Sequence, residues 1–149
     1  MSTGTTLVAF KRALVETLQA RPGLVGVQIS YGFPETEIWD ESIWIEDARA
    51  ELGIPTMKMG TKRVEENYSL TVACQVLRTQ AEGQDVADDR AAELLIELQQ
   101  MLAEKPELIP EILWAEIDGW THHVGALAKS DGHGSRFDVR VRVRARLHP

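Results

Sequence analysis

The sequence has few of the residues that build covalent or metal-based sites. It contains one cysteine, Cys74, and four histidines among 149 residues. A single cysteine cannot form an intrachain disulfide and cannot supply a cysteine-based zinc site. Cys74 falls on the apolar face of a predicted strand, so we interpret it as a small buried hydrophobic residue and not as a nucleophile.

Long hydrophobic runs are also missing. No stretch approaches the ~18 consecutive apolar residues of a transmembrane helix, so we expect no membrane contact. The first residues lack a basic segment followed by an apolar one, and we expect no secretory signal. Hydrophobic residues make up 44% of the chain and charged residues 26%, values typical of globular proteins. The length predicts a single domain over residues 1–149.

Positive charge is scarce and unevenly placed. Sixteen lysines and arginines face 23 acidic residues, for a net charge of −7, which disfavours a general nucleic-acid binder. Residues 85–118 hold ten acids and two bases, whereas residues 136–149 hold five arginines and one acid. Two such patches can attract copies of the chain to one another, or they can meet within one subunit. Charge alone leaves both interpretations open.

Hydrophobic periodicity predicts two helices and four or five strands. Apolar residues recur at helical spacing over residues 5–21 and again after Asp85, which we expect to cap the second helix. Alternating patterns predict four strands, at residues 25–33, 64–77, 112–118 and 136–147. A shorter fifth strand is predicted at residues 42–46. The order is α-β-(β)-β-α-β-β. It predicts an α+β fold with two helices packed on one face of a mostly antiparallel sheet.

Residues 35–62 have the weakest pattern and are expected to form a long, mobile loop. Within it, the short strand at 42–46 would be followed by a helical turn at 47–52. Long connections in compact domains tend to be functional or mobile. Trp39 and Trp44 lie here among acidic residues, where tryptophan often anchors a partner. The predicted interface residues of this stretch are Trp39, Trp44, Glu41, Glu46 and Asp47.

The closing strand is the sharpest local feature. Apolar residues and arginines alternate along it, and a period of two places all the guanidinium groups on one sheet face. Like charges so close together favour acids or phosphates opposite them. Three interpretations remain open: a solvated sheet face, a protein interface or a DNA contact. The predicted interface residues are Arg136, Arg140, Arg142, Arg144 and Arg146.

Sites for chemistry are weakly indicated. Three histidines and one aspartate occur in a glycine-rich segment, 119–135, that is predicted to be a loop, and these residue types bind metals. However, His122 and His123 are adjacent and would point apart in a strand, and their spacing matches no standard metal motif. We predict no metal, no cofactor and no enzymatic activity. The candidate ligands that this prediction sets aside are His122, His123, Asp131 and His133.

Several segments resemble the tail terminator, or tail completion, proteins of long-tailed bacteriophages (siphoviruses). The resemblance lies in the layout and texture of most of the chain after residue 25. The segments that carry it are YGFP (31–34), ESIWIED (41–47), RVEENYSLTVACQV (63–76) and DGHGSRFDVRVRVRARL (131–147). The strand of five arginines departs from the family pattern, so the family assigns it no role.

The resemblance implies a structural assembly protein. Such subunits form a ring, commonly a hexamer, that caps the tail tube, ends tube polymerisation and joins the tail to the head. The implied partners are further copies of the chain, the major tail tube protein and the head-tail connector or head-closure protein. Genomic DNA would pass through the ring without specific binding. The protein would be assembled in the host bacterial cytoplasm and reside in the tail or neck of the virion.

Other functions remain as alternatives. The first is another neck or head-closure protein of similar shape. The second is a small metal-dependent enzyme that uses the histidines near residue 122. The third is a nucleic-acid binder that uses the arginine strand.

Overall fold

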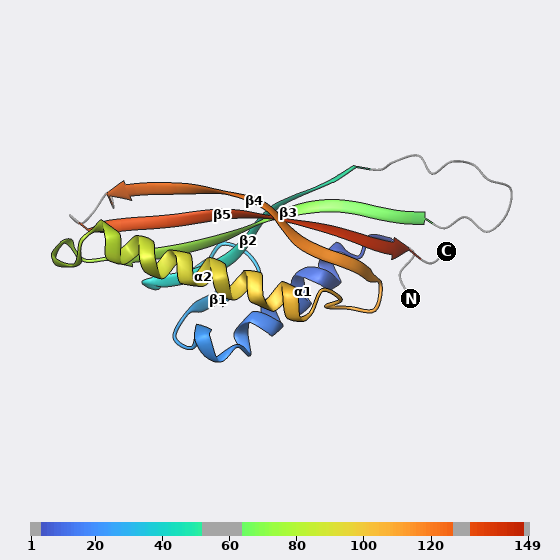
Figure 1. Cartoon of the computed structure of the whole chain (residues 1–149), viewed down its shortest axis with the longest axis horizontal. Helices are drawn as coiled ribbons and strands as arrows, with labels where there is room; N and C mark the ends of the chain where they lie inside the picture. Colours follow the sequence, from blue (N-terminus) through green and yellow to red (C-terminus); the bar gives the residue numbers. More distant parts are fainter. Residues whose placement is uncertain (1–3, 52–63, 127–131, 148–149) are drawn as a thin grey trace, which may run out of the picture.

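The protein is a two-layer α+β domain. A computed structural model describes residues 4–51, 64–126 and 132–147. Two α-helices pack on the same face of a five-stranded sheet (Figure 1). The elements are α1 (Leu7–Gln19), β1 (Gln28–Ser30), β2 (Glu41–Glu51), β3 (Val64–Arg78), α2 (Gln84–Glu104), β4 (Ile112–Ala126) and β5 (His133–Leu147). This arrangement confirms the predicted fold class and element order.

The sheet order explains which segments can meet. The strands lie side by side in the order β1-β2-β3-β5-β4. Only the β1–β2 pair is parallel, and the other three pairs are antiparallel. The last strand of the chain therefore lies inside the sheet, between β3 and β4, and its side chains can reach residues from both neighbours.

The core lies between the helices and the sheet. Apolar residues recur at helical spacing in α1 and α2 and alternate along the strands, so their side chains all lie in this single layer. Burial of these residues supplies the main favourable term in folding. Fully buried members include Phe10, Leu14, Leu94, Leu98, Val72, Val76, Val139 and Val141. Cys74 is buried among them, as predicted.

One acidic residue lies in this apolar layer. Glu66 of β3 is only 4% exposed. Its Oε1 accepts hydrogen bonds from the backbone N–H and the hydroxyl of Thr6, both at 2.9 Å. Because the first N–H groups of a helix lack partners within it, a carboxylate placed there stabilises the start of α1. Glu66 thus ties α1 to β3.

The strand predicted at residues 25–33 is shorter in the structure. A 3₁₀ turn occupies Pro22–Leu24, and Gly26 follows with a positive φ of 85°. This left-handed conformation suits glycine and interrupts an extended chain. Only Gln28–Ser30 pair with β2, so Tyr31 and Phe33 lie beyond the strand.

Two further predictions were wrong because strands continue through irregularities. β2 runs to Glu51 past a register shift between Ile45 and Ala48, which replaces both the helical turn predicted at 47–52 and part of the predicted loop at 35–62. Likewise, β4 runs to Ala126 past a shift between Ile117 and Gly119. A β-bulge adds one residue to a strand without ending the ladder. Residues 52–62 lie outside the described part of the chain.

The start of α2 also differs from the prediction. Gly83 occupies the N-cap position, and no side chain of a described residue caps the helix there. Asp85 lies in the first turn, where its charge still complements the positive end of the helix dipole.

A partly buried cluster of ion pairs joins β2, β3 and α2. Glu41 at the start of β2 accepts hydrogen bonds from Arg78 Nη2 of β3 at 2.5 Å and from Arg90 Nε of α2 at 2.9 Å. Burial acts to raise the pKa of Glu41, but the two arginines outweigh it and hold this pKa below its ordinary value. The carboxylate is therefore favoured in the folded state.

Replacing Glu41 with glutamine should lower the free energy of unfolding by about 1–3 kcal/mol at pH 7. A carboxyl group whose pKa is lower in the folded state stabilises the protein above its unfolded pKa of about 4.3. That contribution is lost as the pH falls through the folded pKa. Urea unfolding should therefore show a smaller difference between wild type and Glu41→Gln at about pH 2.5 than at pH 7. The same difference at both pH values would contradict this role of the charge.

Candidate assembly surface

The sheet face opposite the helices carries the arginines of β5. Along this strand, buried apolar residues alternate with less buried polar ones, which confirms that the arginines share one face. Directly opposed residues on β3 and β4 include Ser69 and Glu116 for Arg142, and Asn67 for Arg144. The structure divides the five arginines into three environments.

Arg136 is enclosed by its own subunit. Its Nη2 lies 2.5 Å from Glu46 Oε1 of β2, and its Nε lies 2.7 Å from Asp138 Oδ1. The guanidinium carbon also lies 5.1 Å from the ring centroid of Trp44. Burial acts to lower the pKa of Arg136, but the bonds to Asp138 and Glu46 raise it overall. This arginine therefore has its acidic partners already.

Trp44 lies beneath Arg136 and is fully buried. Phe33 packs edge-on against Trp44 at a distance of 5.3 Å between ring centroids. The indole Nε1 of Trp44 donates a hydrogen bond to Glu46 at 2.9 Å. The predicted anchor role fails for Trp44, because it has no exposed surface to offer a partner. Trp39 is 52% exposed, and its role as an anchor stays a prediction.

Arg144 and Arg146 lie near the end of β5. Arg144 Nε donates to Glu65 Oε2 of β3 at 2.8 Å. Arg146 Nε is buried, with no hydrogen-bond partner in the described part of the chain.

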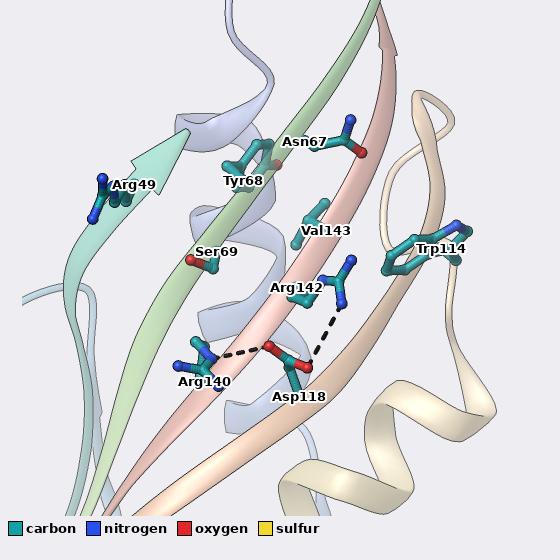
Figure 2. Close-up of a pocket in the computed structure, with 9 residues that line it drawn as sticks. All are labelled: Arg49, Asn67, Tyr68, Ser69, Trp114, Asp118, Arg140, Arg142 and Val143. Carbon is teal, nitrogen blue, oxygen red and sulfur yellow. Dashed lines mark hydrogen bonds and ion pairs between the residues drawn. The ribbon is translucent and has the colours of Figure 1, made fainter. Parts of the chain in front are cut away.

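Arg140 and Arg142 line a groove with a third arginine that the sequence analysis missed. Both side chains point toward Asp118 of the β4 bulge, with closest distances of 3.0 and 3.7 Å (Figure 2). Arg49 lines the groove on the β2 side. In register, Ser69 is the direct partner of both Arg49 and Arg142. The groove has a volume of about 430 Å³, and we call it the arginine groove. It is lined by Arg49, Asn67, Tyr68, Ser69, Trp114, Asp118, Arg140, Arg142 and Val143.

The predicted acidic interface residues differ in availability. Glu41 and Glu46 already bind arginines of the same chain. Asp47 follows Glu46 in β2 and is exposed. Of these three acids, Asp47 therefore has the carboxylate most accessible to another chain.

Three histidines, His122, His123 and His133, lie in β strands and not in the predicted loop. His122 contacts Ser135 at 2.8 Å, lies 3.4 Å from Asp88 and stacks on Phe137. His123 contacts Asp138 on the opposite face at 3.0 Å. The two rings point apart, as predicted from their adjacency. Among the described residues, no group of three potential ligands is close enough to hold a metal; Asp131 lies outside them.

The thiol of Cys74 is not activated. Burial, with a smaller contribution from the charge of Asp138, raises the pKa of Cys74 to about 12. Because the thiolate is the nucleophilic form, the neutral thiol at pH 7 behaves as part of the core, which supports the sequence interpretation.

Comparison with known structures finds the same fold in a chain of a gene transfer agent particle. The protein is similar to a chain described as "Virion of native gene transfer agent (GTA) particle", with a TM-score of 0.60. The match covers 95% of this chain and 99% of that chain, with 16% sequence identity. The likeness is therefore one of fold over nearly the whole length of both chains. No protein-family model matches the sequence, and no curated protein matches it.

Within the part of the chain that the structure describes, neither helix combines the length and apolarity needed to cross a membrane.

Proposed function

We propose that the protein is a structural subunit of a phage-like virion and acts as a tail terminator. In this role it forms a ring, commonly a hexamer, that caps the tail tube, ends tube polymerisation and joins the tail to the head connector. The observation that carries the proposal is the fold shared with the gene transfer agent virion chain over nearly the full length of both chains. The family resemblance of the sequence motifs supports the same role independently of that match.

The surface of the subunit suits a ring. A ring needs a heterologous interface, in which two different patches of each subunit meet. The open sheet face carries the arginine groove, whereas the segment between β1 and β2, residues 31–40, carries three acids and no base. These unlike surfaces on one subunit meet that requirement.

The proposed partners follow from this role. They are further copies of the chain, the major tail tube protein and the head-tail connector or head-closure protein. DNA would pass through the ring without specific binding, because the net charge of −7 opposes a general attraction to phosphate. We propose residence in the virion tail or neck after assembly in the host cytoplasm, and we propose no catalytic role.

Two measurements test the proposal. Native mass spectrometry and negative-stain microscopy of the purified chain, alone and with the tail tube protein of the same particle, should show annular oligomers. Deleting the gene in the producing strain should give tails of uncontrolled length that lack heads. A chain that stays monomeric under both conditions, with normal tails after deletion, would refute the role. Tails of normal length without heads would instead favour a head-closure protein.

A further inference from the structure

We infer that the arginine groove of one subunit binds the acidic aromatic loop, residues 31–40, of a second copy of the chain. The inference rests on the proposed function, because it assigns the contact by which the subunits of the ring meet. Neither the fold match nor the family resemblance identifies this contact.

The groove has more positive charge than its own subunit neutralises. Arg140 and Arg142 are 57% and 52% exposed in their side chains and share the single carboxylate of Asp118. Arg49 makes no ion pair with any residue that the structure describes. A second acid, Glu116, lies directly opposite Arg142 in the register. Three guanidinium groups therefore face two carboxylates, in a protein that is acidic overall.

The acidic aromatic loop has the complementary chemistry. It contains three acids and no base, and none of the three carboxylates makes an ion pair with a described residue. It also exposes large aromatic side chains, with Phe33 59% and Trp39 52% exposed. Arginine binds carboxylates in bidentate geometry and stacks on aromatic rings. Tryptophan and arginine are also the residues that dominate binding energy in interfaces. The acids are Glu35, Glu37 and Asp40.

The loop is held in place by its backbone. Gln28 of β1 donates from Nε2 to the carbonyl of Glu37 at 3.0 Å and accepts from the backbone N–H of Trp39 at 3.1 Å. The hydroxyl of Ser42 donates to the carbonyl of Trp39 at 3.1 Å. These bonds fix the main chain while the acidic and aromatic side chains remain exposed. Such preorganisation reduces the entropy lost on binding.

The two surfaces do not meet within the described part of one subunit. The loop follows β1 at one edge of the sheet and packs Phe33 on Trp44 of the open face, whereas the groove lies farther along the strands, around the register positions of Arg49, Ser69 and Arg142. When the loop of one copy binds the groove of the next without a reciprocal exchange, the contact is heterologous, and each copy keeps one free loop and one free groove until the chain of contacts closes. This is the geometry by which identical subunits form a ring.

A second acidic surface provides the matched control. Asp85 and Asp89 are exposed, one turn apart at the start of α2, on the face covered by the helices. They offer two carboxylates but no exposed aromatic side chain between them. The variant Asp85→Lys/Asp89→Lys changes the net charge as much as Glu35→Lys/Glu37→Lys does, but at a different surface.

The experiment measures self-association of the full chain by sedimentation velocity and native mass spectrometry. Glu35→Lys/Glu37→Lys, Arg49→Glu and Arg140→Glu/Arg142→Glu should each weaken assembly by roughly tenfold or more, because like charges would meet in the contact. Combining the loop reversal with Arg140→Glu/Arg142→Glu should restore most of the assembly. The α2 control should stay within about twofold of wild type.

The outcomes separate this inference from the proposed function. A wild-type ring that tolerates the loop and groove reversals, or that dissociates in the α2 control alone, overturns the inference and leaves the ring intact. A monomeric wild type overturns both. Circular dichroism and urea unfolding check the fold of each variant. If Arg140→Glu/Arg142→Glu does not fold, Arg49→Glu decides, because it removes no ion pair with a described residue.

Discussion

Replacing Trp44 with alanine should lower the free energy of unfolding by about 3–5 kcal/mol, the usual range for removing a large buried aromatic side chain. Trp44 is fully buried on the open sheet face, under Phe33 and Arg136. Its loss would leave a cavity, take the packing partner from Phe33 and remove the indole donor to Glu46. Urea denaturation followed by circular dichroism would measure the change.

Trp39→Ala is the matched control for this prediction. Trp39 comes from the same segment of the sequence but is half exposed, so its replacement should change stability by less than about 1 kcal/mol. The same variant should weaken self-association if Trp39 anchors the neighbouring subunit. Equal losses of stability at the two tryptophans would contradict the burial seen here.

Replacing Arg136 with glutamate should lower the free energy of unfolding by roughly 2–4 kcal/mol. The new carboxylate would lie beside Glu46 and Asp138, both of which now bind the guanidinium group. The substitution would also remove the guanidinium cation from the ring of Trp44. Glu46 lies on β2, whereas positions 136 and 138 lie on β5, so the repulsion would act between these two strands across the open face.

Arg142→Glu is the control on the same strand and face. Arg142 is half exposed and lies 3.7 Å from Asp118, and exposed ion pairs contribute little to stability. We expect a change within about 1 kcal/mol, together with the weaker assembly described above. Similar destabilisation at positions 136 and 142 would show that the arginines form a single structural unit, against the division proposed here.

The errors in the predicted strands have a common cause. A period of two identifies a strand only while the side chains alternate without interruption. The irregularities at Ile45/Ala48 and Ile117/Gly119 shift the alternation by inserting residues, so each strand looks as if it ends there. β3 and β5 show no such shift between them, and both were predicted close to their observed lengths.

The partners of the arginines were unpredictable for a different reason. The alternation in β5 placed the side chains on one face, but Glu46 and Arg136 are 90 residues apart in the sequence. Arg49 was missed because it lies in β2 beyond the bulge, where the local pattern suggested a helical turn. Glu66 is an acidic residue on the apolar face of β3, and this pattern alone indicates a buried polar contact. The tertiary structure was needed to identify Thr6 as its partner.

The sequence by itself determined the fold class, the order of the elements, the buried faces of both helices and the common face of the five arginines, because each of these depends on residues close together in the chain. The tertiary structure alone decided which arginines are neutralised, that Trp44 is buried while Trp39 is exposed, and that Arg49 joins Arg140 and Arg142 in one groove. Those outcomes depend on strand order and register, which bring together residues that no local pattern connects.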